Sequence, residues 1–177
     1  MNTLSGKIDL PELKSIKDTA KSNLKESLGF PKGLSYIGLV AIKDEATRDF
    51  VLEGLSAIGL GNVCLGEIDT TTRRYAGSRA EINQNELYAF DFFVHDGELD
   101  GLDVVKCMKS GVVPVMPANN IFAGMLTDFN PMKFEGNGFF FKSNNPYCIF
   151  EKVVSYLENV KFPEDRRILL KHVSETF

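Results

Sequence analysis

Four short polar segments, each directly after an apolar run, hold the residues that are best suited to chemistry. These segments are Ile42–Asp44, His95–Gly101, Pro117–Ile121 and Lys142–Asn145. In a parallel α/β sheet the ligand binds beyond the carboxyl ends of the strands, so segments of this kind surround the site. Their carboxylates and lysines suit an aspartyl phosphate beside a metal ion, and their lysines and backbone amides suit the binding of a phosphate-bearing ligand.

Composition excludes several other classes of function. The 177-residue chain has 20 basic and 24 acidic residues, and its net charge of −4 gives no electrostatic basis for binding nucleic acid or an anionic membrane. Two histidines and three separated cysteines, Cys64, Cys107 and Cys148, form neither a zinc pattern nor a disulfide pattern. No apolar run reaches the roughly 20 residues that span a bilayer, and the first residues lack a signal-peptide layout. We therefore expect a cytoplasmic protein without a metal site, a nucleic-acid partner or a membrane partner.

The alternation of apolar runs with amphipathic stretches predicts the order of strands and helices. Strands are expected at 35–42, 62–68, 89–95, 112–116 and 138–142. Helices are expected at 9–28, 44–58, 101–111, 146–160 and 163–177, and the first three are closed by Gly29, Gly59 and Gly111. The segment Asp69–Asn85 is weakly periodic and is expected to be a loop, with a short helix near Glu81–Leu87.

Strands that are almost continuously apolar and alternate with helices predict an α/β fold. Such strands are buried on both sides, so the expected architecture is a doubly wound, Rossmann-like parallel sheet with helices on both faces. A length of 177 residues suits one such domain better than two. We expect residues 1–177 to form this single domain, with a leading helix region at 1–34 and a closing helix at 161–177.

One resemblance is to the receiver domains of signalling proteins. AIKDEATRDF resembles the acidic turn after a receiver's first strand, DFFVHDGELDGLDVV its acceptor strand and GFFFKS its last strand. This resemblance implies that Asp44 and Glu45 bind Mg²⁺, that Asp96 accepts the phosphate and that Lys142 is the counter-ion. However, the loop after Asp96 is short for a receiver, and PVMPANN lacks the Ser or Thr that should follow the fourth strand. The receiver is therefore the less favoured interpretation.

A second resemblance extends over nearly the whole chain. It is to the C-terminal, nucleotide-sugar-binding half of GT-B glycosyltransferases, in particular glycogen/starch synthases. The order and spacing of several motifs carry it: GKID, LKESLGFPKG, YIGLV, YAFDFFVHDGELDGLDVVKCMKSGVVPVM, GNGFFFKSNNPYCIFEKVV and EDRRILLKHVSETF. From Glu98 to Pro114 the family pattern matches without a gap.

This resemblance implies glucosyl transfer with retention, from ADP-glucose or UDP-glucose to an α-glucan, without a cofactor or a metal ion. It implies that Glu98 faces the donor sugar and that Arg48 or Lys43 faces the phosphates, with Glu98 and Arg48 as the candidate catalytic residues. The candidate substrate-binding residues are Lys43, Gly101, Leu102, Asp103, Asn119 and Asn120. In GT-B enzymes the active site lies between two domains, so activity also requires an N-terminal domain as partner.

Several positions depart from the family pattern. The Arg and Lys expected after the first strand fall on Ile42 and Thr47, and the glycines of a sugar-contacting loop fall on Asn119 to Ile121. Asp103 places a carboxylate where a pyrophosphate would sit, and a carboxylate there is typical of a helix cap. A non-catalytic GT-B-like domain with a scaffolding or regulatory role is therefore the alternative.

Overall fold

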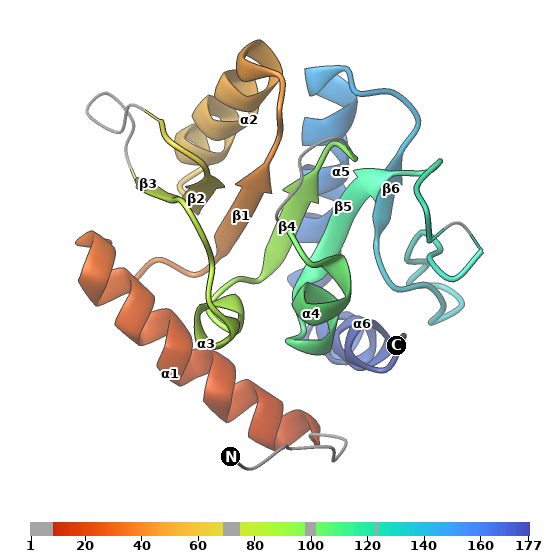
Figure 1. The fold of residues 1–177 in the computed structure, drawn as a ribbon. Helices are drawn as coiled ribbons and strands as arrows, with labels where there is room; N and C mark the ends of the chain where they lie inside the picture. Colours follow the sequence, from red (N-terminus) through yellow and green to blue (C-terminus); the bar gives the residue numbers. More distant parts are fainter. Residues whose placement is uncertain (1–8, 69–74, 98–101, 123) are drawn as a thin grey trace.

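The computed structural model describes residues 9–68, 75–97, 102–122 and 124–177, which form a parallel sheet with helices around it (Figure 1). The strands are β1 (Ile37–Ala41), β2 (Gly61–Leu65), β3 (Ala76–Arg79), β4 (Phe92–His95), β5 (Val113–Pro117) and β6 (Phe139–Phe141). The helices are α1 (Leu10–Leu28), α2 (Glu45–Ala57), α3 (Gln84–Leu87), α4 (Val104–Lys109), α5 (Pro146–Val160) and α6 (Pro163–Ser174).

The strands lie in the order β3-β2-β1-β4-β5-β6, and every neighbouring pair is parallel. This is the order 3-2-1-4-5-6 of the Rossmann fold, in which the chain reverses direction across the sheet between β1 and β4. The flavodoxin-like order 2-1-3-4-5 lacks the outer strand that β3 provides here. The fold expected from the sequence, a doubly wound Rossmann-like parallel sheet, is confirmed.

Strand β3 corrects the sequence-based expectation for this part of the chain. A loop was expected over Asp69–Asn85, but Ala76–Arg79 pair with β2 in the register Asn62↔Ala76 to Leu65↔Arg79. The segment AGSR has no apolar pattern because β3 is an edge strand, held by backbone hydrogen bonds on one side. The short helix expected next to it is present as α3.

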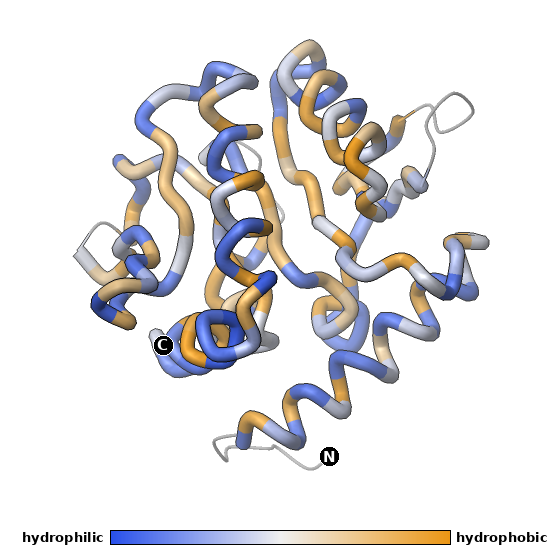
Figure 2. Tube along the Cα trace, turned by 180° about the vertical axis from the view of Figure 1, so that it is seen from behind, coloured by the Kyte–Doolittle hydropathy of each residue, from blue (hydrophilic) through white to orange (hydrophobic). Residues whose placement is uncertain are grey.

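The helices cover both faces of the sheet and the end at which its strands begin. Helices α2 and α5 contact each other, and contact β1, β2, β5 and β6 on one face, while α4 contacts β5 from the other face (Figure 1). Helices α1, α3 and α6 lie near the starts of the strands (Figure 1). Figure 2 shows polar residues along much of α1 and α6, as expected for helices at the edge of a domain.

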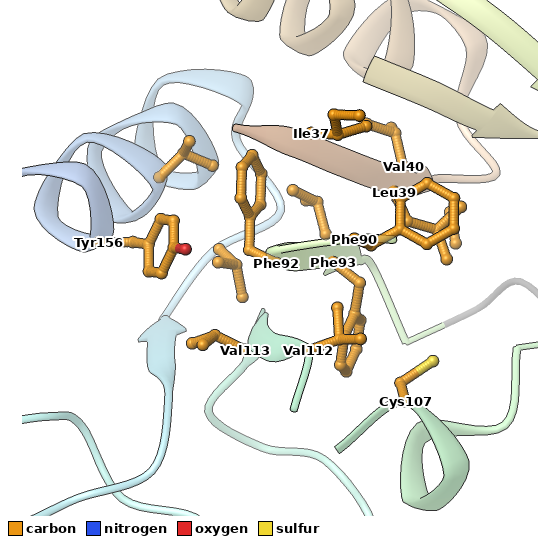
Figure 3. Packing of buried hydrophobic residues seen from close by; sticks show 14 of the residues in the cluster. Ile37, Leu39, Val40, Phe90, Phe92, Phe93, Cys107, Val112, Val113 and Tyr156 are labelled. Carbon is orange, nitrogen blue, oxygen red and sulfur yellow. The ribbon is translucent and has the colours of Figure 1, made fainter. Parts of the chain in front are cut away.

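The core lies between the sheet and these helices. Every residue of β1, β2, β4, β5 and β6 is buried. In Figure 3 Tyr156 of α5 lies against Phe92 of β4, with 5.1 Å between the ring centroids. Gly38 in β1 makes room for the Phe92 ring, because a Cβ at this position would lie 2.5 Å from a ring carbon. None of the described helices is long and apolar enough to cross a membrane.

Candidate functional site

The turn from β1 into α2 lies at the carboxyl edge of the sheet, where the strand order reverses. Asp44 is the N-cap of α2, and its Oδ2 accepts the backbone N–H of Thr47 at 2.8 Å. This hydrogen bond lowers the pKa of Asp44 below its ordinary value, so the carboxylate is charged at neutral pH. Glu45 adds a second carboxylate in the first turn. The helix end that would attract an anion therefore already carries two negative charges.

The candidate catalytic residue Arg48 is directed toward acids of its own helix. Its Nη2 lies 3.9 Å from Glu45 Oε1, and its Nε lies 3.7 Å from Asp49 Oδ1. The Arg48 side chain is only 17% exposed. A guanidinium in this position neutralises neighbouring carboxylates and is poorly placed to neutralise a ligand.

Three of the four polar segments meet around Asp96. The buried Asp96 carboxylate accepts the backbone N–H of Lys43 at 2.6 Å, and its carbonyl accepts Nδ2 of Asn144 at 3.3 Å. His95 Nδ1 accepts the backbone N–H of Gly97 at 2.8 Å, and Gly97 has a φ of +86°, which favours glycine. Asp96 and His95 thus shape the loops at this edge.

Asp103 is the N-cap of the short helix α4. Its Oδ1 accepts the backbone N–H of Lys106 at 3.0 Å, which lowers the pKa of Asp103, and its Oδ2 pairs with Lys106 Nζ. Helix α4 has six residues and contacts α3, α6 and β5 (Figure 1). Such a short helix offers a weak dipole to an anion. Leu102 packs partly buried against the core, whereas the candidate residues Glu98 and Gly101 lie outside the described residues.

The two candidate asparagines follow β5. Asn120 holds its own turn, because Nδ2 donates to the Pro117 carbonyl at 2.6 Å and Oδ1 accepts the Phe122 N–H at 2.8 Å. Asn119 is exposed, and the neighbouring Ile121 is 93% exposed. The amide of Asn120 is therefore engaged in the loop itself, and Asn119 has the freer position of the two.

Neither the strand order nor the positions of the candidate acids support the receiver interpretation. Asp44 and Asp96, its metal ligand and its phosphate acceptor, both accept backbone N–H groups that hold loops in place. Lys142 is exposed after β6. Within the described ranges, no three His, Cys, Asp or Glu side chains are grouped so that they could hold a metal ion.

Comparisons with known proteins find similar folds among the solved structures. No family model matches the chain, and no curated protein matches it by sequence. A similar solved structure is the catalytic domain of starch synthase IV from Arabidopsis thaliana bound to ADP and acarbose, with a TM-score of 0.74 and 15% sequence identity. The match covers 97% of this chain and 41% of that one.

The fold is that of the Rossmann-like C-terminal domain of GT-B glycosyltransferases. The GT-B expectation from the sequence motifs is thus confirmed at the level of the fold. The chain spans about two fifths of the length of the starch synthase structure. An identity of 15% relates the two folds, and the activity has to be argued from the site.

Proposed function

We propose that this chain is a GT-B-like domain of the glycogen/starch synthase type with a non-catalytic, scaffolding or regulatory role. The N-terminus of α2 carries this proposal. A sugar-nucleotide donor needs cations and free backbone amides around its diphosphate. At this helix end Asp44 takes up an amide, Glu45 adds a negative charge, and Arg48 is directed toward Glu45 and Asp49.

A working donor-binding half is the second candidate. It is supported by the likeness to a starch synthase domain that was solved with ADP and acarbose. In this case Lys43 and Arg48 face the phosphates, Glu98 faces the glucose and an N-terminal domain completes a retaining glucosyltransferase. The two candidates differ in one measurable property, the binding of the donor nucleotide at the carboxyl edge of the sheet.

A ¹H–¹⁵N NMR titration with ADP, ADP-glucose and UDP-glucose separates the two candidates, because it reports where a ligand binds. For the non-catalytic domain we expect the amides of residues 43–48 to show no saturable shift, which corresponds to a Kd weaker than about 1 mM. Crowded carboxylates at the helix end are the physical reason for this result.

The variant Arg48→Ala gives the matched comparison. Saturable shifts at residues 43–48 in the unmodified chain that disappear in Arg48→Ala would establish a working donor site and refute the non-catalytic proposal. Shifts that are the same in both chains would refute it as well, and would remove Arg48 from the candidate site.

A further inference from the structure

A cavity of 760 Å³ lies at the end of the sheet opposite the candidate site. It is formed by α1, the last turn of α5 and the first turns of α6, and it reaches Asp91 and Val113 at the starts of β4 and β5. Figures 1 and 2 both show α1 and α6 at this end of the sheet. Its volume is in the range of about 300–1,000 Å³ that is typical of small-molecule sites.

The lining of this cavity is cationic although the chain as a whole is acidic. Its cationic residues are Lys14, Lys17, Lys21, Lys161, Arg166 and Arg167. The acidic residues of the lining are Asp18 and Asp91. A concave surface lined by one sign of charge concentrates ligands of the opposite sign.

Two of the lysines that line the cavity, Lys17 and Lys21, are buried. Lys21 Nζ contacts Asp91 Oδ1 at 2.6 Å and donates to the Ser35 carbonyl at 3.3 Å. Lys17 Nζ donates to the carbonyls of Phe90 at 2.6 Å and Ser110 at 3.4 Å. Because an ammonium group has three N–H donors, these contacts leave one donor on each lysine for a further acceptor.

One buried carboxylate, that of Asp91, faces two cations and a backbone amide here. Asp91 pairs with Lys21, lies 4.0 Å from Arg166 Nη2 and accepts the backbone N–H of Ile37 with its other oxygen. Burial lowers the pKa of Lys17 to about 8; Asp91 opposes this shift, and Lys21 and Arg166 add to it. Buried charge of one sign in excess is costly, and a bound anion would relieve the cost.

Aromatic and aliphatic groups form the rest of the wall. The Arg166 guanidinium lies over the Tyr36 ring, 5.8 Å from its centroid. Burial raises the pKa of Tyr156 well above its ordinary value, so this phenol is neutral and adds no negative charge. Leu10 and Leu170 also line the cavity. These groups suit the organic part of a ligand.

We propose that this cavity binds a small organic phosphate, which the buried Lys17 and Lys21 and the more exposed Lys14 and Arg166 of its lining would hold. The site is independent of the carboxyl edge of the sheet and of the donor nucleotide. A phosphate group matches the excess positive charge, and a hydrophobic substituent matches Tyr36 and the leucines.

Phenyl phosphate is a suitable probe because it combines a phosphate group and an aromatic ring in one small molecule. In a ¹H–¹⁵N NMR titration we expect saturable shifts at the amides around Lys17, Lys21, Asp91 and Arg166. Inorganic phosphate should bind there more weakly because it lacks the ring. The variant Arg166→Gln, at an exposed position, should keep the fold and weaken phenyl phosphate roughly tenfold, as expected for the loss of one charge-assisted contact.

Two control variants make the test specific. Lys171→Gln removes an exposed positive charge from the same helix outside the cavity lining, and Arg48→Ala alters the carboxyl edge; neither should change the affinity. The proposal is overturned by absence of saturable shifts in the unmodified chain, by unchanged binding in Arg166→Gln, or by equal loss in Lys171→Gln. Equal affinity for phenyl phosphate and inorganic phosphate would overturn the assignment of an organic ligand.

Discussion

The carboxylates of Asp44 and Asp103 occupy the positions at their helix N-termini that the phosphate groups of a bound nucleotide would take. Each carboxylate accepts a backbone N–H in the first turn of its helix, and for each that hydrogen bond lowers the pKa. The sequence predicted Asp103 as a helix cap and a helix that begins at Asp44, and in the structure both residues are N-caps. The direction of Arg48 toward Glu45 and Asp49 could not be predicted, because it depends on rotamers and packing.

Lys17, Lys21 and Asp91 were missed by the sequence-based reasoning. A signal was present: Lys17 and Lys21 lie one turn apart on the helix face that also carries the buried Leu13 and Leu24, and Asp91 interrupts the apolar run AFDFFV. Charged residues within apolar patterns indicate buried ion pairs. Which lysine meets which acceptor follows from the tertiary fold.

The buried Lys17 gives a pH-dependent term in stability. The pKa of Lys17 is about 8 in the folded chain and has its ordinary value of 10.5 in the unfolded chain, so the unfolded state binds more protons between these two values. The free energy of unfolding of the unmodified chain, relative to Lys17→Gln, should therefore rise by about 2 kcal/mol from about pH 7 to about pH 9.5. Urea denaturation of both chains at the two pH values measures this difference, and a constant difference would contradict the buried, charge-crowded environment.

At the scale of elements, most strands and helices followed from apolar periodicity and capping residues, and β3 did not. A four-residue edge strand of sequence AGSR has no burial pattern to detect, and it forms because β2 offers a pairing edge and Gly77 fits against Leu28 of α1. This strand has large consequences, since it distinguishes the Rossmann order from the flavodoxin-like order. Without it, the receiver and GT-B interpretations share the same alternation of strands and helices.

Close packing between β1 and β4 is testable at Gly38. In Gly38→Ala the new methyl group would lie 2.5 Å from a carbon of the Phe92 ring, which itself packs against Tyr156. We expect the free energy of unfolding to fall by about 1–3 kcal/mol, as is typical of overpacked cores. Gly33→Ala, where a Cβ meets nothing within 4 Å, is the control and should change it by less than about 0.5 kcal/mol. Equal effects of the two substitutions would contradict the described packing.

In the whole molecule a GT-B fold is combined with an N-terminus of α2 that carries the carboxylates of Asp44 and Glu45, and we propose that these disfavour a diphosphate. The fold and the donor site depend on different residues: the sheet depends on the buried strands, whereas donor binding depends on a few charges at helix ends. The family resemblance predicted the fold correctly. For donor binding it gave only the departures from the family pattern at Ile42, Thr47 and Asp103, because motif positions do not show where neighbouring cations point.

We propose that the carboxylates of Asp44 and Glu45 keep a donor diphosphate away from the N-terminus of α2. The double variant Asp44→Asn, Glu45→Gln tests it, because asparagine is as good an N-cap as aspartate while both negative charges are lost. The matched control is Asp9→Asn, Glu12→Gln, which makes the same changes at the start of α1, where Asp9 accepts the Glu12 N–H at 2.8 Å.

The deciding measurement is the ADP-induced ¹H–¹⁵N NMR shift at residues 43–48 in these two variants and in the unmodified chain. We predict a saturable shift in Asp44→Asn, Glu45→Gln. Its Kd should be roughly three- to thirtyfold lower than the limit of about 1 mM expected for the unmodified chain, since each removed charge at a helix N-terminus contributes about 0.3–1 kcal/mol. The control should behave like the unmodified chain. A saturable shift in the unmodified chain, or none in the double variant, would contradict the claim.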